Sequence, residues 1–211
     1  AVDLSNLKTK SKDGKGNRAL IEKATRACLD AGAVPIMFGG DDSTPIPFLQ
    51  AFSDQRVITV LQIDAHIDWR EERYGERLGY SSTMRRASEM SHIWRIVQVG
   101  AHGLGSAREE EVTAARNWGA HLVTAQSIFT HGMQSALSHI EAGSDCVICL
   151  DLDVLDAAVM PAVAHPSPGG LSFTHLSDLF AGVAAKARIA GFSMVEFTPA
   201  KDQHGTAAYT A

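Results

Sequence analysis

The stretch DCVICLDLDVLD (145–156) is the clearest strand signal in the chain, because apolar and β-branched residues fill it until acidic residues end it. A strand that is covered on both faces shows such a continuous apolar run, whereas a half-exposed strand alternates. The segment VITVLQID (57–64) has a similar composition and also ends in an acid. The two segments therefore predict a parallel sheet with both faces covered.

The rest of the chain alternates between short apolar runs and patterns of helical period. We expect a short buried strand at 33–38 and further strands at 93–100, 120–125 and 192–200. We expect helices at 17–32, 43–52, 83–90, 106–119, 127–143 and 174–191, with loops at 1–16, 65–82 and 164–173. This alternation predicts an α/β fold of three layers, α/β/α, with a mostly parallel sheet. No linker or repeat divides the chain, so we expect a single domain over 1–211.

The composition excludes several classes of protein. A formal net charge of −5 without any basic stripe argues against nucleic acid as a partner. No apolar run approaches the roughly 18 residues that a membrane span needs. The first residues, AVDLSNLKTKSKDGKGNR, are polar and do not resemble a signal peptide. We therefore expect a cytoplasmic protein that binds neither nucleic acid nor membrane.

The three cysteines, Cys28, Cys146 and Cys149, fit free thiols in a reducing compartment. The CVIC motif formed by two of them is also found in redox and zinc sites. Here it lies inside an apolar, β-branched run, where residues three apart point to opposite faces of a strand. We therefore interpret both cysteines as core residues.

Acidic side chains follow one expected strand after another. Ligands of parallel α/β sheets bind at the carboxyl ends of the strands, so these positions are the candidate site. The residues concerned are Asp41 and Asp42, then Asp64, His66 and Asp68, then Asp151, Asp153 and Asp156, and finally Glu196.

The spacing of these acids indicates a metal site. DAHID and DLD place their polar residues two apart, which in extended backbone puts the side chains on one face. Converging carboxylates repel one another unless a cation balances them. Carboxylates with one imidazole suit Mn²⁺ best, with Ni²⁺, Fe²⁺, Co²⁺ or Zn²⁺ as alternatives. Each motif alone also fits an ordinary turn or solvated loop; their joint occurrence at strand ends favours one or two divalent ions.

Four blocks of the sequence resemble the signature blocks of the ureohydrolases, the agmatinase and arginase family, and most closely its agmatinase-like branch. They are GGDDS, IDAHIDW, LDLDVLDAAVMPAVAHPSPGGLSF and MVEFTPAKDQHGTAAYTA, in the family's order. The resemblance implies a three-layer α/β/α fold, a dinuclear manganese centre and a homo-oligomer (trimer or hexamer). It further implies hydrolysis of a small guanidino compound, either agmatine-like or a guanidino acid, to urea and an amine. It also implies that this chain lacks the family's N-terminal strand and C-terminal helix, which leaves a sheet edge unprotected.

The same resemblance assigns roles to individual residues. Asp64 and Asp151 match the ligands that bridge the two metals, and Asp68 matches a ligand that also orients the metal-bound hydroxide that attacks the guanidinium carbon. Glu196 matches the acid that holds the substrate guanidinium, a role that suits a carboxylate facing a planar fork of N–H donors. The other matching ligands are His66 and Asp153.

Three positions depart from the family pattern. Asp42 stands where the family usually has a ligand histidine, which adds negative charge and alters the expected metal preference. The stretch GYSSTMRRASE lacks the histidine that many members use to shuttle protons. His165, before a proline in AVAHPSPGG, is a candidate to replace part of that role and to bind substrate; a loop histidine without function is the alternative.

Two further hypotheses stay open. One is a non-catalytic or metal-deficient ureohydrolase-like subunit or binding protein, which the replacement at Asp42 motivates. The other keeps the fold and changes the bond that is cleaved, as in formiminoglutamase-like or deacetylase-like relatives. Asp41 has a separate role in either case, because adjacent side chains cannot both aim at one metal from extended backbone. We expect Asp41 to bind nearby backbone N–H groups or a side chain next to the ligands.

Overall fold

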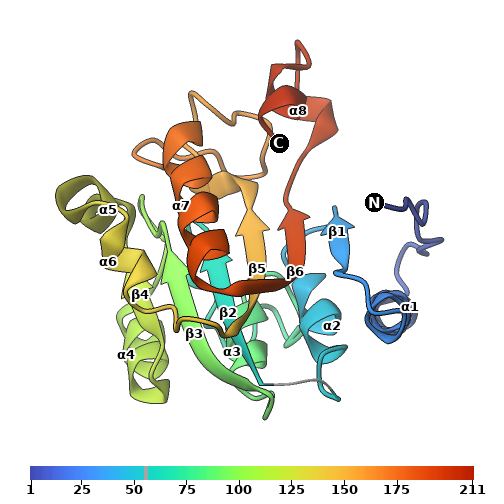
Figure 1. The fold of residues 1–211 in the computed structure, drawn as a ribbon. Coiled ribbons are helices and arrows are strands. Elements are labelled where there is room, and N and C mark those ends of the chain that lie inside the picture. The colour runs from blue at the N-terminus through green and yellow to red at the C-terminus, as the bar shows by residue number, and fades with distance from the viewer. Residues whose placement is uncertain (55–56) are drawn as a thin grey trace.

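The computed structural model describes residues 1–54 and 57–211, and its centre is one six-stranded sheet. The strands are ordered β1–β6–β5–β2–β3–β4, and every neighbouring pair is parallel, as Figure 1 shows by the common direction of the arrows. The strands are β1 (Ile36–Phe38), β2 (Ile58–Ile63), β3 (Ile93–Val99), β4 (His121–Val123), β5 (Asp145–Asp151) and β6 (Arg188–Val195). The predicted parallel sheet is confirmed.

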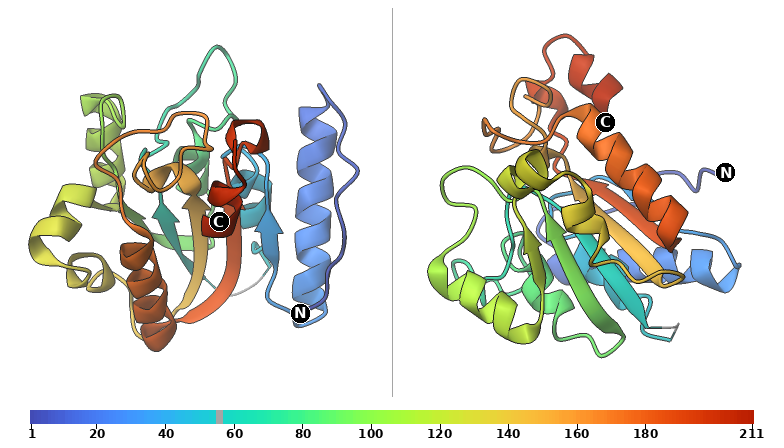
Figure 2. Two further views of the ribbon diagram at one scale, coloured as in Figure 1. Left: turned by 90° about the horizontal axis from the view of Figure 1, so that it is seen from above. Right: turned by 60° about the vertical axis from the view of Figure 1, so that its left-hand side comes forward.

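Helices cover both faces of this sheet. On one face, α5, α6 and α7 pack with β2, β3 and β5 into one apolar core, and on the other face α2, α3 and α4 form a second core (Figures 1 and 2). The helices are α1 (Gly14–Asp30), α2 (Pro45–Gln50), α3 (Thr83–Ala87), α4 (Glu109–Trp118), α5 (Ala125–His131), α6 (Gln134–Leu137), α7 (Phe173–Lys186) and α8 (Thr206–Thr210). The three-layer α/β/α fold predicted from the sequence is confirmed.

The two central strands, β2 and β5, are buried along their whole length, as their continuous apolar runs predicted. Cys146 contributes to one apolar core and Cys149 to the other, so the CVIC residues do point to opposite faces of β5. Both thiols are free, and burial raises the pKa of each to about 12. They are core residues, as predicted.

The expectation of a buried strand at 33–38 is wrong. β1 pairs only with β6 and forms an edge of the sheet, where Ile36 is 59% and Phe38 69% exposed. Helix α1 packs against α2 beside this edge and leaves both side chains uncovered (Figure 1). Apolar composition predicts a strand but does not distinguish an edge from a centre, because that depends on which strands pair.

Two helix predictions also need correction. The segment 127–143 forms two helices instead of one, since Gly132 adopts a φ of 75° and ends α5. The segment 174–191 is helical only to Lys186, and residues from Arg188 onward already belong to β6. The ion pair between Arg188 and Asp145 joins the first residues of the paired strands β6 and β5. This pairing between distant segments outweighs the local helical pattern.

Connections at the carboxyl ends of the strands form the upper edge of the molecule in Figure 2 (left), where residues 65–82 and 155–172 extend beyond the arrowheads. The first of these connections has only an isolated bridge between Arg73 and Glu76, as the predicted loop requires. No helix within the described residues is long and apolar enough to cross a membrane.

Candidate active site

Strand register brings the acidic residues together. Ile63 of β2 is paired with Leu150 of β5, so Asp64 and Asp151 follow at the same level on adjacent strands. Asp151 is in turn paired with Val195 of β6, which places Glu196 one residue further along. The backbone N–H of Glu196 donates to Gly40 O at 3.0 Å, which joins this level to the loop after β1. Parallel pairing therefore collects residues that are far apart in sequence.

The collected side chains form two groups that could each hold a metal ion. In each group, one potential ligand atom per residue lies within 4.8 Å of the others. The first group is Asp64, His66 and Asp153, and the second is Asp42, Asp64 and Asp151. Asp64 belongs to both groups, which is the arrangement expected of a residue that bridges two ions.

The acids converge through turns and not through extended backbone, so this part of the spacing argument is wrong. Asp64 Oδ1 accepts from the N–H of His66 at 2.6 Å, and Asp151 Oδ1 accepts from the N–H of Asp153 at 2.8 Å. Residues Leu152–Val154 form a 3-10 turn, and Asp68 has a φ of 45°. In each motif, the backbone turns so that the N–H two residues later donates to the aspartate carboxylate. Aspartate makes this local hydrogen bond readily.

His66 lies between two of the carboxylates. Its Nδ1 is 3.3 Å from Asp64 Oδ1 and 3.1 Å from Asp153 Oδ2. Burial opposes the imidazolium, but the hydrogen bonds to Asp153 and Asp64 raise the pKa of His66 to about 11. The same contact outweighs burial at Asp153 and lowers the pKa of that carboxyl. A positive charge is therefore favoured at the position where a metal ion would sit.

The remaining carboxyls lack a balancing charge. Burial, followed by repulsion from Asp64, raises the pKa values of Asp42, Asp68 and Asp151 well above the ordinary value. Asp42 Oδ2 is buried and receives no hydrogen bond from any donor within 1–54 and 57–211. Buried oxygens that repel one another and lack donors fit a divalent cation, because its charge lowers the cost of keeping them ionised. The donor set of carboxylates and one imidazole fits manganese or a similar ion.

Two glutamines support this cluster, and neither was predicted from the sequence. Gln62 Nε2 donates to Asp64 Oδ2 at 2.7 Å and to Asp68 Oδ2 at 3.0 Å. Gln98 donates to the side-chain oxygen of Gln62 and, at 2.7 Å, to Ile67 O. Both amides are buried within strands that are mostly apolar. A polar residue in such a run requires a partner, and this signal was available in VITVLQID and IWRIVQVG.

The segment that lacks the family's histidine supports the ligands through its backbone and one hydroxyl. Thr83 Oγ1 donates to Asp42 O, and the backbone N–H groups of Met84 and Arg85 both donate to Asp68 O at 3.1 Å. The start of α3 therefore holds the backbone of two candidate ligands in place.

Most of these acidic side chains line a cavity of about 720 Å³, which Glu196 and His165 also line. Glu196 is half-buried, has a φ of 69° and accepts from the N–H of Asp42 at 2.9 Å. His165 is exposed on the wall formed by the loop after β5.

Asp41 accepts from the N–H of Ser43 at 3.2 Å, the backbone contact predicted for it. His102, another imidazole of the wall, has its Nδ1 2.8 Å from Gly100 O.

The sheet, the two overlapping groups that could hold metal ions and Glu196 in the same cavity define an α/β protein with a candidate dinuclear metal centre. The family model described as "Arginase family" matches residues 1–211, and the chain belongs to this family.

Individual relatives agree with this assignment. The chain is 31% identical over 186 residues to an N(1)-aminopropylagmatine ureohydrolase of Thermus thermophilus, an alignment that covers 88% of this chain and 61% of the relative. The structure of agmatine ureohydrolase from Thermoplasma volcanium matches 96% of the chain and 67% of its own length, with a TM-score of 0.84 and 25% identity. Formimidoylglutamase of Bacillus subtilis shares the fold, with a TM-score of 0.89 and 22% identity over 99% of this chain and 67% of its own. The chain thus spans about three fifths of the curated relative's length.

Proposed function

We propose that this protein hydrolyses a small guanidino compound to urea and an amine with two divalent ions, Mn²⁺ or alternatively Ni²⁺. The observation that carries the proposal is the joint presence of two overlapping ligand groups and a half-buried glutamate in one cavity. The donors that would hold the ions are Asp42, Asp64, His66, Asp68, Asp151 and Asp153. The ions would supply Lewis acidity and make water nucleophilic near neutral pH.

The chain's own residues orient the reactants. Glu196 presents a carboxylate to a guanidinium, whose planar N–H donors fit it in a bidentate pair. The hydrogen bond from Asp42 N–H fixes the Glu196 carboxylate beside the candidate ligands. Asp68, which accepts a hydrogen bond from Gln62, would orient the attacking water. His165, which lines the same cavity, is the proposed substrate contact.

The test measures urea released from a panel of guanidino substrates by the chain after loading with Mn²⁺ or Ni²⁺. We expect turnover, and we expect Glu196→Gln to lower kcat/KM by about 10- to 100-fold, since the variant keeps the shape but loses a charged hydrogen bond. Glu110→Gln, on an exposed turn of α4, is the matched control and should change nothing.

Metal analysis separates this proposal from the alternatives. About two ions per chain with no release of urea from any substrate would contradict it. Fewer than one ion per chain would support a non-catalytic, metal-deficient subunit. Formamide in place of urea, from a formimino substrate, would support a formiminoglutamase-like reaction.

Assembly and location are further proposals. We propose a homo-oligomer, a trimer or hexamer, to be checked by light scattering of the purified protein. We also propose a cytoplasmic location, which the free thiols of Cys28, Cys146 and Cys149 support because such thiols persist in reducing compartments.

A further inference from the structure

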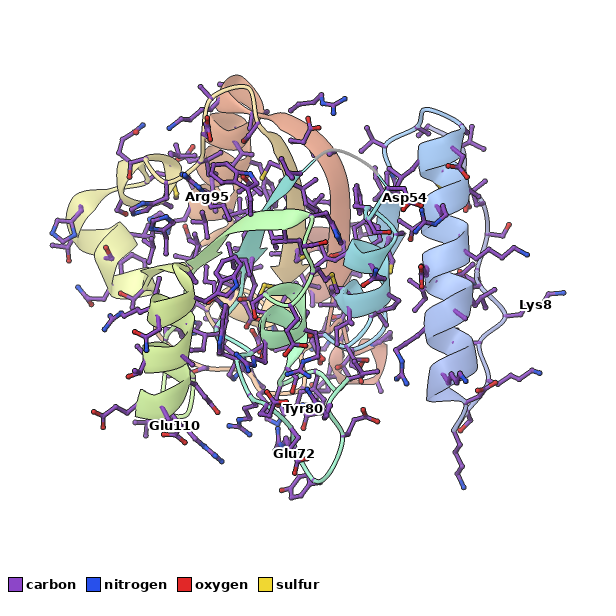
Figure 3. The ribbon with its side chains drawn as sticks, turned by 90° about the horizontal axis from the view of Figure 1, so that it is seen from below. Lys8, Asp54, Glu72, Tyr80, Arg95 and Glu110 are labelled. Carbon is purple, nitrogen blue, oxygen red and sulfur yellow. The ribbon has the colours of Figure 1, made fainter. Side chains whose placement is uncertain are left out.

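An arginine lines the wall of the cavity that contains the candidate metal ligands. Arg73 belongs to the loop between β2 and α3, and it lines the same cavity as Asp42 and Glu196. Figure 3 labels Tyr80 and Glu72 on this loop, near the edge of the molecule at which the strands end. The cavity therefore combines a floor of carboxylates with a cation on its wall.

Arg73 is held in place by its own loop. The residues Tyr74 and Gly75 have φ values of 53° and 80°, and Arg73 and Glu76 exchange backbone hydrogen bonds of 3.0 Å on either side of them. Positive φ at both central residues is the signature of a tight hairpin turn. The guanidinium carbon of Arg73 lies 5.0 Å from the centre of the Tyr80 ring, and its Nη1 donates to Ser81 Oγ at 3.3 Å.

The neighbouring cations already have carboxylate partners. Arg70, also in the cavity wall, donates to Glu111 at 3.0 Å. Arg77 is paired with Glu71 at 2.5 Å, and Arg85 is paired with the same carboxylate at 3.0 Å. Arg73 has no carboxylate within 4 Å among the residues that the structure describes, so its charge is free to bind an anion.

We propose that Arg73 binds the carboxylate of an ω-guanidino acid, which makes anionic guanidino acids the substrate class of this protein. This inference rests on the proposed guanidino hydrolysis and adds the charge at the other end of the substrate. The guanidinium would face Glu196 while the carboxylate faces Arg73, so a zwitterionic substrate complements the charges of these two residues. A diamine analogue such as agmatine would place its ammonium against the arginine, and like charges at close range disfavour binding.

The test compares three substrates that differ only in the terminal group: 4-guanidinobutyrate, 1-butylguanidine and agmatine. The panel also includes ω-guanidino acids whose carbon chains have two to six atoms, each with its neutral analogue. One of these lengths should match the distance between Arg73 and Glu196. We expect the best acid to exceed its neutral analogue of equal length by about 10- to 100-fold in kcat/KM, the usual contribution of a charged hydrogen bond.

Two variants connect the preference to this side chain. Arg73→Gln should lower kcat/KM for the acid much more than for 1-butylguanidine and so remove the advantage of the acid, and Arg73→Glu should reverse the preference in favour of agmatine. Arg77→Gln, on the same loop with its guanidinium turned to Glu71, is the control and should keep the preference of the wild type.

The outcomes distinguish this inference from the function on which it rests. Release of urea with equal or better turnover of agmatine, unchanged in Arg73→Gln, would overturn the role of Arg73 and leave guanidino hydrolysis intact. No urea from any compound would overturn both. Isothermal titration of 4-guanidinobutyrate into the wild type and Arg73→Gln gives a second readout, and equal affinities would also contradict the inference.

Discussion

At the scale of single residues, the site is built from carboxylates whose repulsion must be balanced. Two kinds of partner achieve this in the chain itself: His66 between Asp64 and Asp153, and Gln62 between Asp64 and Asp68. Charged groups that lose water need such partners or a cation. This requirement leads to two predictions about individual side chains.

Gln62→Leu should weaken Mn²⁺ binding by about 10- to 100-fold, because residues that orient metal ligands contribute at this level. The variant removes the donor to Asp64 and Asp68 and leaves the strand apolar. Thr59→Val is the matched control, since Thr59 is buried in the same strand and its hydroxyl has no partner within the described parts of the chain. Calorimetric titration with Mn²⁺ measures both, and equal affinities for the two variants would contradict the role of Gln62.

Asp42→Asn should reduce the number of ions bound per chain, measured by elemental analysis after dialysis against Mn²⁺. The substitution keeps the size of a buried side chain and removes the negative charge that a cation would balance. Asp41→Asn is the control, because this neighbouring side chain is exposed and bonds to Ser43. Unchanged metal content in Asp42→Asn would contradict a role for the charge of Asp42 in holding the ions.

At the scale of elements, the sheet has a buried centre and an exposed edge, although both were expected to be buried. Ile148 of β5 is 1% exposed, whereas Phe38 of β1 is 69% exposed. The two strands have similar apolar composition, so only the order of strands explains the difference. Their contributions to stability should therefore differ.

Ile148→Ala should lower the free energy of unfolding by about 2–5 kcal/mol, the usual cost of removing a buried aliphatic side chain and leaving a cavity. Phe38→Ala should change it by less than about 0.5 kcal/mol, as is typical of exposed positions. Urea denaturation followed by circular dichroism measures both variants. A large loss in Phe38→Ala would mean that another surface covers the β1 edge in solution.

At the scale of the whole molecule, the acid cluster makes folding depend on pH and on metal. Burial and mutual repulsion raise the pKa values of Asp42, Asp68 and Asp151. A carboxyl whose pKa is raised by folding stabilises the folded state fully below its ordinary pKa, and this contribution is lost as pH rises through the raised value. The pKa of His66 is also raised, to about 11, so His66 changes stability with pH in the same direction. Its stabilising contribution is complete below the ordinary histidine pKa and is lost as pH rises toward the raised value.

The metal-free protein should therefore have a lower Tm at about pH 8 than at about pH 5. Added Mn²⁺ should raise Tm more at the higher pH, because the ion binds deprotonated ligands and stabilises the folded state by mass action. Differential scanning fluorimetry with and without a chelator measures this. A larger effect of Mn²⁺ at the lower pH would contradict an acid-lined metal site.

The sequence by itself determined the order of the elements, the parallel central strands and the candidate ligands, because apolar runs and acidic strand ends are local signals. The resemblance to the ureohydrolases added the expected roles of Asp64, Asp151 and Glu196. The change from helix α7 to strand β6 within 174–191 and the turns after β2 and β5 were harder to predict from the sequence. They depend on strand pairing and local hydrogen bonds that periodicity does not encode.

Only the tertiary structure decided which side chains share the cavity and which strand lies at the edge. Gln62, the partner of Asp64 and Asp68, is itself held by Gln98 because the parallel strands β2 and β3 align the two glutamines. Arg73 lines the cavity from a loop that contains a tight turn. The contacts of Gln98 with Gln62 and Ile67 join residues 36 and 31 positions apart, and the local pattern of apolar and polar residues does not specify them. The candidate ligands of the site could therefore be predicted from the sequence. The residues that hold these ligands in place, and the proposed charge selectivity, depend on how the chain packs.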